Sequence, residues 1–405
     1  FGGSLVAGIV IALIAMILDR ITSGLAKNSV TYKPREKSFL RRNKFWFLAI
    51  TGVLFFYILS FIFPILNQWP ESYFISPAKF ISNGLDIFIL NFGTQIDYLK
   101  QVAFFFIMLP VKIGLQLSVS PYTWGFELTP FLITAYFIIM MLFASWCFLK
   151  FSKDVAIGII LFSIFIYFGL TNMPWLPLIL IYGLIGFKIG GLKLSLTIVA
   201  SFLFITFTGV LPQALLSIYL CGIAVIISFI LGSSLGIWAA HNDKVSAFMR
   251  PINDTMQTMP SFVILIPFVM FFGIGEFTAL LAIIAYAFVP AMRYTEHGLR
   301  NLPETVIEAA RMIGCSQTQL LWKVKIPLAM PVIMLGLNQT IMFGLAMLVI
   351  AALVGTTGLG QLIYIGLSKA DFGTGMISGV SIALIAIIFD RTTQAWRIKL
   401  EKKTQ

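Results

Sequence analysis

The sequence predicts an all-α polytopic membrane protein, and its composition and the length of its apolar runs both lead to that fold class. Hydrophobic residues make up 59% of the 405 residues and charged residues only 11%, and the mean hydropathy is +0.96. A soluble domain of this size has too little interior to hide so much apolar surface. Apolar runs long enough to cross a bilayer recur along the chain, and a helix satisfies its own backbone hydrogen bonds in lipid.

Eleven membrane spans are predicted, each an apolar run bounded by polar or charged residues. So many apolar runs of this length predict membrane-spanning helices, because a buried helix of a soluble protein is shorter and alternates with polar segments. The spans are expected near residues 3–18, 45–66, 128–149, 155–172, 176–187, 194–211, 213–238, 258–274, 276–292, 328–350 and 376–389.

Lysine and arginine gather in alternate loops, which gives the predicted spans one orientation. The loop 19–44 holds eight Lys or Arg residues against two acids, so it is expected to be cytoplasmic. Following the spans outward and back places four more basic segments and the tail on the same side, and the acidic or neutral turns on the other. The basic segments are 150–153, 188–193, 244–250, 293–325 and 391–403. The net charge of +12 is thus a topology signal and does not point to nucleic acid.

Segment 102–120 is apolar but is not predicted to span the membrane. Lys112 and Pro110 interrupt it, and a lysine at mid-membrane costs about 2.5–3.5 kcal/mol on insertion scales. Counting it as a span would also reverse every later loop. We therefore expect residues 67–127 to lie outside, as helices along the outer surface.

The first span is repeated at the other end of the chain. Residues 1–26 and 372–397 align at a constant offset of 371, with twelve identities in the first twenty-two positions. Both copies begin with Phe-Gly and end the apolar run with Asp-Arg. A duplicated membrane unit explains this better than two unrelated spans. We expect residues 1–26 to be the last span of an upstream unit.

The basic loop after the ninth span predicts two short helices. Pro303 and Glu304 suit a helix start. Glu304–Ile313 can form a short helix that ends at Gly314. Ala309 and Ala310 give this helix a low surface that another protein can approach closely. A second helix is expected at Thr318–Val324, with Pro327 breaking it before the next span. The alternative is a structured loop that packs only on its own protein.

These residues resemble the EAA loop of ABC importer permeases, whose pattern is EAA-x3-G-x9-I-x-L-P. Three residues separate the Glu-Ala-Ala triplet from the glycine, and nine more precede Val-Lys-Ile-Pro. In that family the loop is the coupling helix that enters a cleft of the cytoplasmic ATPase. The resemblance implies an ATPase-coupling role for Glu308, Ala309, Ala310, Gly314, Val324, Ile326 and Pro327. If the repeat is complete, a second such loop lies upstream of Phe1, since Glu308 precedes Phe372 by 64 residues.

Residues 249–267 and 338–360 are similar to permeases of glycine betaine/proline betaine and related quaternary-amine importers. This similarity covers residues 192–397, and residues 1–26 as the tail of a second copy. It implies the transmembrane domain of a type I ABC importer with an extra N-terminal membrane region, in a bacterial plasma (inner) membrane. The implied parts are 1–26, a basic cytoplasmic linker 27–44, an accessory region with a periplasmic segment 45–191, the permease domain 192–397 and a cytoplasmic tail 398–405.

The resemblance implies partners but no cofactor in this chain. Cytoplasmic ABC ATPase subunits would bind ATP and Mg, a periplasmic or extracellular substrate-binding protein would deliver the substrate, and a second permease unit would be fused upstream or supplied by a homodimer. The alternative from another class is an ATP-independent secondary transporter or channel for small organic cations. Against it, the span interiors carry almost no ionisable residues, which ion-coupled transporters use.

Four residues are candidates for lining the translocation path. Gln257 and Met259 open one predicted span, and Asn338 and Met342 lie four apart on another, so they share one helix face. Amide groups and polarizable methionines can accommodate a quaternary ammonium without holding it as tightly as a fixed acid would. The alternatives are plain helix packing for the first pair and interhelical hydrogen bonding for Asn338.

Nucleotide, metal and disulfide chemistry are not predicted. Gly355–Gly360 is glycine-rich but lacks GK[ST] and a preceding strand, so it is expected to be a turn rather than a phosphate loop. His241 and His297 stand singly, without a second ligand in the sequence nearby. The three cysteines lie far apart in the sequence.

Overall fold

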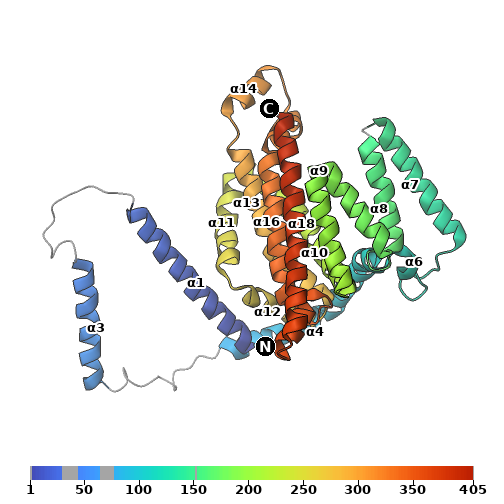
Figure 1. Ribbon diagram of the computed structural model, residues 1–405. Coiled ribbons are helices and arrows are strands. Elements are labelled where there is room, and N and C mark those ends of the chain that lie inside the picture. The colour runs from blue at the N-terminus through green and yellow to red at the C-terminus, as the bar shows by residue number, and fades with distance from the viewer. Residues whose placement is uncertain (1, 30–43, 64–76, 151–152, 405) are drawn as a thin grey trace. The chain divides into compact units, whose positions relative to one another are not determined.

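The computed structural model describes residues 2–29, 44–63, 77–150 and 153–404, and every regular element in these ranges is a helix (Figure 1). The predicted all-α class is confirmed. Two compact units are present, Phe1–Asp86 and Ile87–Gln405.

The first unit contains α1 (Gly2–Ser29), α3 (Lys44–Ile62) and the beginning of α4 (Pro77–Ala103). The predicted spans 3–18 and 45–66 fall on α1 and α3. Hydrophobic side chains are exposed along α3, as in Leu48 and Val53, which suits a helix that contacts lipid. Most of the predicted linker 27–44, and residues 64–76, lie outside the described residues.

The second unit begins with the rest of α4 and a set of accessory helices. A π-helical turn (Phe104–Met108), α5 (Leu109–Ile113) and α6 (Leu115–Ser118) are followed by α7 (Pro130–Lys150) and α8 (Lys153–Phe168). Helices α7 and α8 correspond to the predicted spans 128–149 and 155–172. Segment 102–120 is broken at Gly114, whose φ of 81° favours glycine. The Gly114 and Gly169 backbones cross so closely that a Cβ on Gly114 would lie 2.3 Å from the Phe168 carbonyl carbon.

A lysine of the accessory region is bound to the start of α13 (Glu276–Arg300). Lys112 Nζ lies 2.6 Å from Glu276 Oε1, and the Glu276 carboxylate also accepts from Thr357 Oγ1 at 3.2 Å and Tyr219 Oη at 3.3 Å. Lys100 Nζ donates to the carbonyl of Phe272 at 3.3 Å. The accessory segment therefore meets the core where α12 (Ser261–Phe272) ends and α13 begins, at the end expected to be outside.

Helix α9 (Trp175–Phe207) is two arms that turn back on each other at Gly191, where φ is 77° and ψ is −168°. Ser195 Oγ donates to the Gly183 carbonyl at 2.8 Å, and the rings of Tyr182 and Phe202 stack at 5.2 Å. The two arms match the separately predicted spans 176–187 and 194–211. Helix α10 (Leu211–His241) follows.

Helices α10, α13 (Glu276–Arg300) and α16 (Ile326–Ala351) pack closely at the centre of the second unit. Glycines allow the close approach. Gly232 and Gly236 of α10, four residues apart, face the α13 backbone, and a Cβ on Gly236 would lie 2.6 Å from the Met292 carbonyl oxygen. A Cβ on Gly336 of α16 would lie 2.8 Å from Tyr294 Cβ. Such small-residue contacts bring membrane helices together through van der Waals packing.

The predicted span 258–274 contains α12, which is shorter than predicted at 12 residues, and a helix that was not predicted precedes it. Helix α11 already begins at Asp243 and runs to Thr258, and α12 (Ser261–Phe272) follows at 104° to it. Asn242 starts α11, because its Oδ1 accepts the Lys244 N–H at 3.0 Å. Pro260 ends it, since a residue before proline avoids the helical region and Met259 has ψ of 132°. The predicted loop 244–250 is thus helical.

The C-terminal part returns to a long helix. The predicted turn at Gly355–Gly360 is present, with φ of 83° at Gly355 and 143° at Gly358, but α17 (Leu359–Ser368) starts within it. Helix α18 (Phe372–Thr404) covers the predicted span 376–389. Asp371 caps it: its carboxylate accepts from the Thr374 hydroxyl at 2.7 Å, and this bond lowers the pKa of Asp371.

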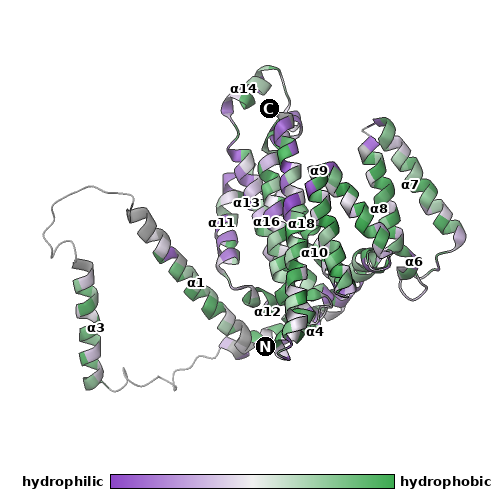
Figure 2. Ribbon diagram, in the orientation of Figure 1, coloured by the Kyte–Doolittle hydropathy of each residue, from purple (hydrophilic) through white to green (hydrophobic). Residues whose placement is uncertain are grey.

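Six helices in the described part of the chain are long and apolar enough to cross a membrane, or seven if the bent α11–α12 pair is one span. The prediction of eleven is higher because it divides α9 into its two arms and includes shorter apolar helices such as α8. Hydrophobic residues dominate the helices of the second unit, and hydrophilic ones gather where α14 (Glu304–Met312) and the C-terminal end of α18 lie (Figure 2).

Candidate functional site

The loop between α13 and α16 contains the predicted helix. Helix α14 spans Glu304–Met312, with Pro303 as its N-cap and an acid in its first turn. Gly314 ends it in a left-handed conformation with φ of 86°. The Gly314 N–H donates to the Arg311 carbonyl at 2.9 Å and the Cys315 N–H to the Ala310 carbonyl at 3.2 Å, the paired bonds of a Schellman motif. The expected helix and its glycine stop are confirmed.

The second expected helix differs from the prediction. Ser316 and Gln319 form a capping box that starts α15 (Gln317–Gln319), and a π-helical turn at Leu320–Lys325 continues directly into α16. The predicted break at Pro327 is wrong. Pro327 lies in the first turn of α16, where a π turn has shifted the backbone bonding and the missing N–H of proline is tolerated.

The loop exposes large apolar side chains. Met312 is 87% exposed and Ile313 84%, while Ala310 is buried. Glu308 and Ala309 are exposed beside them. Trp322, after the capping box, is 62% exposed. Exposed apolar side chains of this kind are typical of protein contact surfaces, and the coupling role of the loop stays a prediction.

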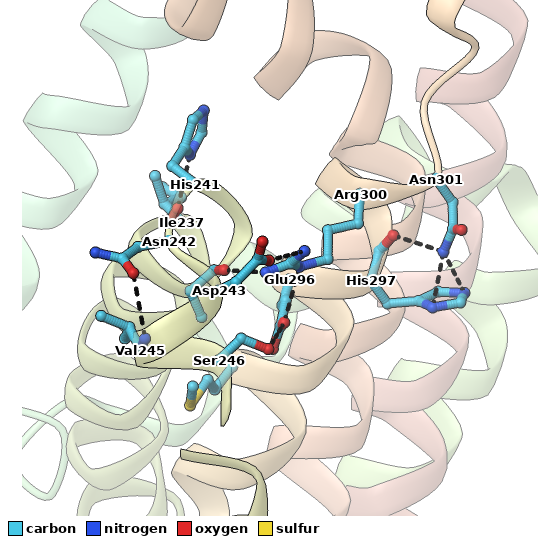
Figure 3. A network of polar contacts seen from close by, with 12 residues as sticks. Ile237, His241, Asn242, Asp243, Val245, Ser246, Glu296, His297, Arg300 and Asn301 are labelled. Carbon is cyan, nitrogen blue, oxygen red and sulfur yellow. Dashed lines mark hydrogen bonds and ion pairs between the residues drawn. The ribbon is translucent and has the colours of Figure 1, made fainter. Parts of the chain in front are cut away.

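An ionic network lies beneath the loop and ties three helix ends together (Figure 3). Arg300, the last residue of α13, donates to Glu296 Oε1 at 2.9 Å and Asp243 Oδ1 at 2.8 Å. A third bond reaches the Ala239 carbonyl of α10 at 2.6 Å. Ser246 of α11 donates to the same Glu296 oxygen at 2.6 Å. These bonds hold the end of α13, where the loop begins, to α10 and α11.

Sequence reasoning missed this network. The spacing of Glu296 and Arg300, four apart on a helix, signals an ion pair, but nothing local links Arg300 to Asp243. His241 and His297 take part in nearby hydrogen bonds, to the Ile237 carbonyl at 2.8 Å and to Asn301. Across the ranges that the structure describes, no three His, Cys, Asp or Glu side chains gather as a metal site.

Comparison with known proteins places this arrangement in a family. The model of the "binding-protein-dependent transport system inner membrane component" matches residues 232–397, which include α13, the loop and α16. The trimethylamine N-oxide transport system permease protein TmoV of Pelagibacter ubique (strain HTCC1062) is 32% identical over 410 residues, 99% of this chain and 49% of that protein. The chain thus spans about half the length of TmoV.

Two glycine betaine permeases match a shorter part of the chain. The glycine betaine/proline betaine transport system permease protein ProW of Escherichia coli (strain K12) is 40% identical over 226 residues, 56% of this chain and 64% of ProW. The glycine betaine transport system permease protein OpuAB of Bacillus subtilis (strain 168) is 36% identical over 266 residues, which cover 65% of this chain and 94% of OpuAB. The chain belongs to the binding-protein-dependent transport permeases.

The expected resemblance is therefore confirmed at the level of the family, and with the apolar helices it makes the chain a multi-pass protein of the bacterial inner membrane. Within this permease, the match 232–397 begins after the accessory helices and inside α10. The predicted domain limits stay predictions.

Two of the four predicted path residues lie at the break between α11 and α12. Gln257, in the last turn of α11, is exposed, and its Oε1 accepts from Arg293 Nη1 of α13 at 2.6 Å. Arg293 also forms an ion pair with Asp254. Met259 is half-buried at the extended residue that ends α11. The pathway role of both residues stays a prediction.

The other two predicted path residues lie on α16 and differ in their surroundings. Asn338 is 7% exposed. Its Nδ2 donates to Asp390 Oδ1 of α18 at 2.8 Å, and its Oδ1 accepts from Thr393 at 2.7 Å. The interhelical alternative thus describes Asn338 in this structure. Met342 is half-buried.

We expect the Asn338→Leu change to destabilise the permease by about 1–3 kcal/mol, because Asp390 and Thr393 lose their partner inside the helix bundle. The double change Asn338→Leu with Asp390→Leu should recover part of that loss. Thermal unfolding in detergent measures both, with Gln339→Leu, on the adjacent half-buried amide, as the control. Equal unfolding temperatures for Asn338→Leu and Gln339→Leu would contradict the interhelical bond.

Proposed function

We propose that this chain is the membrane subunit of an ATP-driven importer for a quaternary amine osmolyte or a close chemical relative. The observation that carries the proposal is the exposed α14 surface, which has the EAA-loop spacing and stands on a fixed base at the end of α13. Relatives that match the chain carry trimethylamine N-oxide, glycine betaine or proline betaine in their names. These compounds share a fully substituted nitrogen and an anionic oxygen.

The proposed partners follow from this surface. A cytoplasmic ABC ATPase would receive α14. The exposed residues Glu308, Ala309 and Gly314 would form the contact, and the buried Ala310 would support the helix from its inner side. ATP and Mg would be bound by that partner, because the sequence of this chain has no P-loop pattern. A substrate-binding protein would deliver the osmolyte from outside. A second permease unit, fused upstream or supplied by another copy, would complete the path.

Coupling would proceed through the helix connections around α14. The loop continues through the π-helical turn into α16 without a break, and Arg300 holds its other end to α10 and α11. Helices α13 and α16 are packed tightly, with Val332 3.1 Å from a Cβ placed on Gly298. A movement of α14 would thus be passed to both helices together, and two discrete arrangements of this group would give inward and outward access.

Val324, Ile326 and Pro327 would pass the movement of α14 to α16 and would not contact the ATPase. Val324 lies in the π-helical turn, and Ile326 and Pro327 begin α16. Val324 and Ile326 are half-buried. They join the docking helix to the span.

Reconstitution tests the proposed function. The purified chain, any fused upstream part, a candidate ATPase and a candidate binding protein are placed in liposomes, and uptake of labelled glycine betaine is measured. We expect uptake with ATP and none with a non-hydrolysable analogue. Uptake that is equal without ATP would support the alternative, ATP-independent transport of small organic cations, which the family assignment does not favour.

The proposed path runs past Gln257, Met259, Asn338 and Met342. Single cysteines at positions 257, 338 and 342, in a background lacking Cys147, Cys221 and Cys315, can be probed with a water-soluble thiol reagent. We expect the cysteine at 338 to be protected at rest, since α18 covers it, and to react during ATP-driven uptake.

Position 339 is the control for this experiment, because it is offset by about 100° from 338 on the same helix. If 339 reacts and 338 and 342 do not, another face of α16 lines the path. If none of the four reacts during uptake, these helices do not form it.

A further inference from the structure

An arginine within α13 joins that helix to the last turns of α11. Arg293 Nη1 donates to Gln257 Oε1 at 2.6 Å, and Nη2 forms an ion pair with Asp254. Asp254 and Gln257 are three residues apart, so they lie on one face of α11, which packs beside α13 (Figure 1). We call these three residues the Arg293 cluster.

The Arg293 cluster lies between the two ends of a membrane helix. Arg293 follows Glu276 by seventeen residues and precedes Arg300 by seven, which is about 25 Å and about 10 Å along the helix axis. The hydrocarbon core of a bilayer is about 30 Å thick. With Glu276 at the end expected to be outside, Arg293 is placed near the inner edge of that core. Charged side chains at such a depth face the interior of the bundle or a water-filled cavity.

The ion pair is accessible despite this depth. The Arg293 side chain is 37% exposed and the Asp254 side chain 45%, and Gln257 is exposed as well. A guanidinium has five N–H donors in a planar fork, and its bonds to Gln257 and Asp254 use two of them. The other donors can bond an oxygen that enters from the open side.

The charges of the cluster match those of a zwitterion. The proposed substrates carry a fully substituted nitrogen and an anionic oxygen, and the cluster offers one positive and one negative side chain. Arginine binds an anionic oxygen through short, directed hydrogen bonds, and the Asp254 carboxylate attracts the substituted nitrogen. Each end of the substrate thus meets an opposite charge, so its entry between the two side chains leaves no charge without a counter-charge.

We propose that the Arg293 cluster contacts the substrate in the translocation path. Arg293 binds the anionic oxygen of a zwitterionic amine, Asp254 faces its substituted nitrogen, and Gln257 orients the guanidinium through its amide oxygen. This inference rests on the proposed transport function and deepens it, because it names the part of the substrate that the membrane subunit recognises.

The liposomes of the reconstitution experiment test the site, with glycine betaine uptake and stimulated ATP hydrolysis measured on the same sample. We expect the double change Arg293→Met and Asp254→Met to lower uptake roughly tenfold or more, which corresponds to the loss of one hydrogen bond to a charged group. Stimulated hydrolysis should persist, because the α14 surface is unchanged. Removing both members of the pair leaves no charge uncompensated, so the unfolding temperature in detergent should stay close to that of the unchanged chain.

A second ion pair of similar exposure is the matched control. Arg397 and Glu401 of α18 are paired at 3.4 Å with side-chain exposures of 30% and 44%. The double change Arg397→Met and Glu401→Met removes the same charges at the predicted cytoplasmic tail, and it should leave uptake unchanged.

Arg293→Lys is the second variant, which decides the matter if the double Met variant folds poorly. Lysine keeps the charge but not the planar fork, so we expect a normal unfolding temperature with reduced uptake. Full uptake in Arg293→Lys and in the double Met variant would mean that the ion pair only joins α11 to α13, and the site would be refuted.

Two further outcomes also overturn the site. An equal loss of uptake in the α18 control would assign the effect to the removal of charge in general. A parallel loss of stimulated hydrolysis would mean that the changes block the movement of the helices. Failure of the proposed function is recognised separately, because the unchanged chain would then show no ATP-driven uptake, and the site would fall with it.

Discussion

Charge reversal at Glu308 is expected to leave the permease folded and inserted but to abolish ATP-driven uptake. Glu308 is exposed on α14, so we expect the effect of Glu308→Lys to fall on the docked ATPase. The measurement is substrate-stimulated ATP hydrolysis together with uptake in liposomes. Lys369→Glu, an exposed charge reversal after α17 at the opposite end, is the control. Normal stimulated hydrolysis in Glu308→Lys would remove α14 from the coupling contact.

A second test at the same loop compares two substitutions of Gly314, one expected to be disruptive and one expected to be tolerated. Gly314→Pro should abolish uptake, because proline fixes φ near −65° where the structure has 86° and removes the N–H that bonds the Arg311 carbonyl. Gly314→Asn keeps that N–H, and asparagine tolerates the left-handed region. No atom lies within 4 Å of a Cβ at this position. We expect the Asn variant to keep most of its uptake.

Gly236→Leu is expected to prevent assembly of the core, at a cost above about 3 kcal/mol. A side chain at 236 meets the Met292 carbonyl at 2.6 Å and Thr295 Cβ at 2.8 Å. These atoms belong to the α13 helix, so the two helices must separate. The measurement is the yield of monodisperse protein in detergent and its unfolding temperature.

The matched control lies on the same helix. Gly222→Leu makes the same change of side chain where no atom lies within 4 Å of the Cβ. If Gly222→Leu and Gly236→Leu lower the yield and the unfolding temperature equally, leucine is harmful in α10 for a reason other than its contact with α13.

Features with local causes could be predicted from the sequence. The helical class follows from composition, and both ends of α14 follow from Pro303, Glu304 and Gly314, whose effects act within one turn. The two arms of α9 were separable because two lysines and two glycines interrupt the apolar run. The role of α14 came from the spacing of a known pattern, and the contact it implies stays a prediction.

Features that depend on distant partners could not be predicted. Asn338 is held by Asp390, 52 residues away, and Arg300 by Asp243, 57 residues away. Pro260 is a local signal for the bend, but the prediction placed it within the apolar span 258–274. No local sequence pattern predicted the π-helical turn at Leu320–Lys325. Because of this turn, Pro327 is compatible with a continuous helix.

The pair of Lys112 and Glu276 has a consequence for how the chain is made. Lys112 emerges from the ribosome 164 residues before its partner, together with the accessory helices, and Glu276 enters the membrane later at the start of α13. Side-chain exposures of 21% and 16% mean that each charge loses much of its water once the helices close. The accessory helices would thus give α13 a preformed counter-charge as it inserts. Among the described residues, a chain shortened to begin after α8 would leave the Glu276 carboxylate with the hydroxyls of Tyr219 and Thr357 as its hydrogen-bond partners.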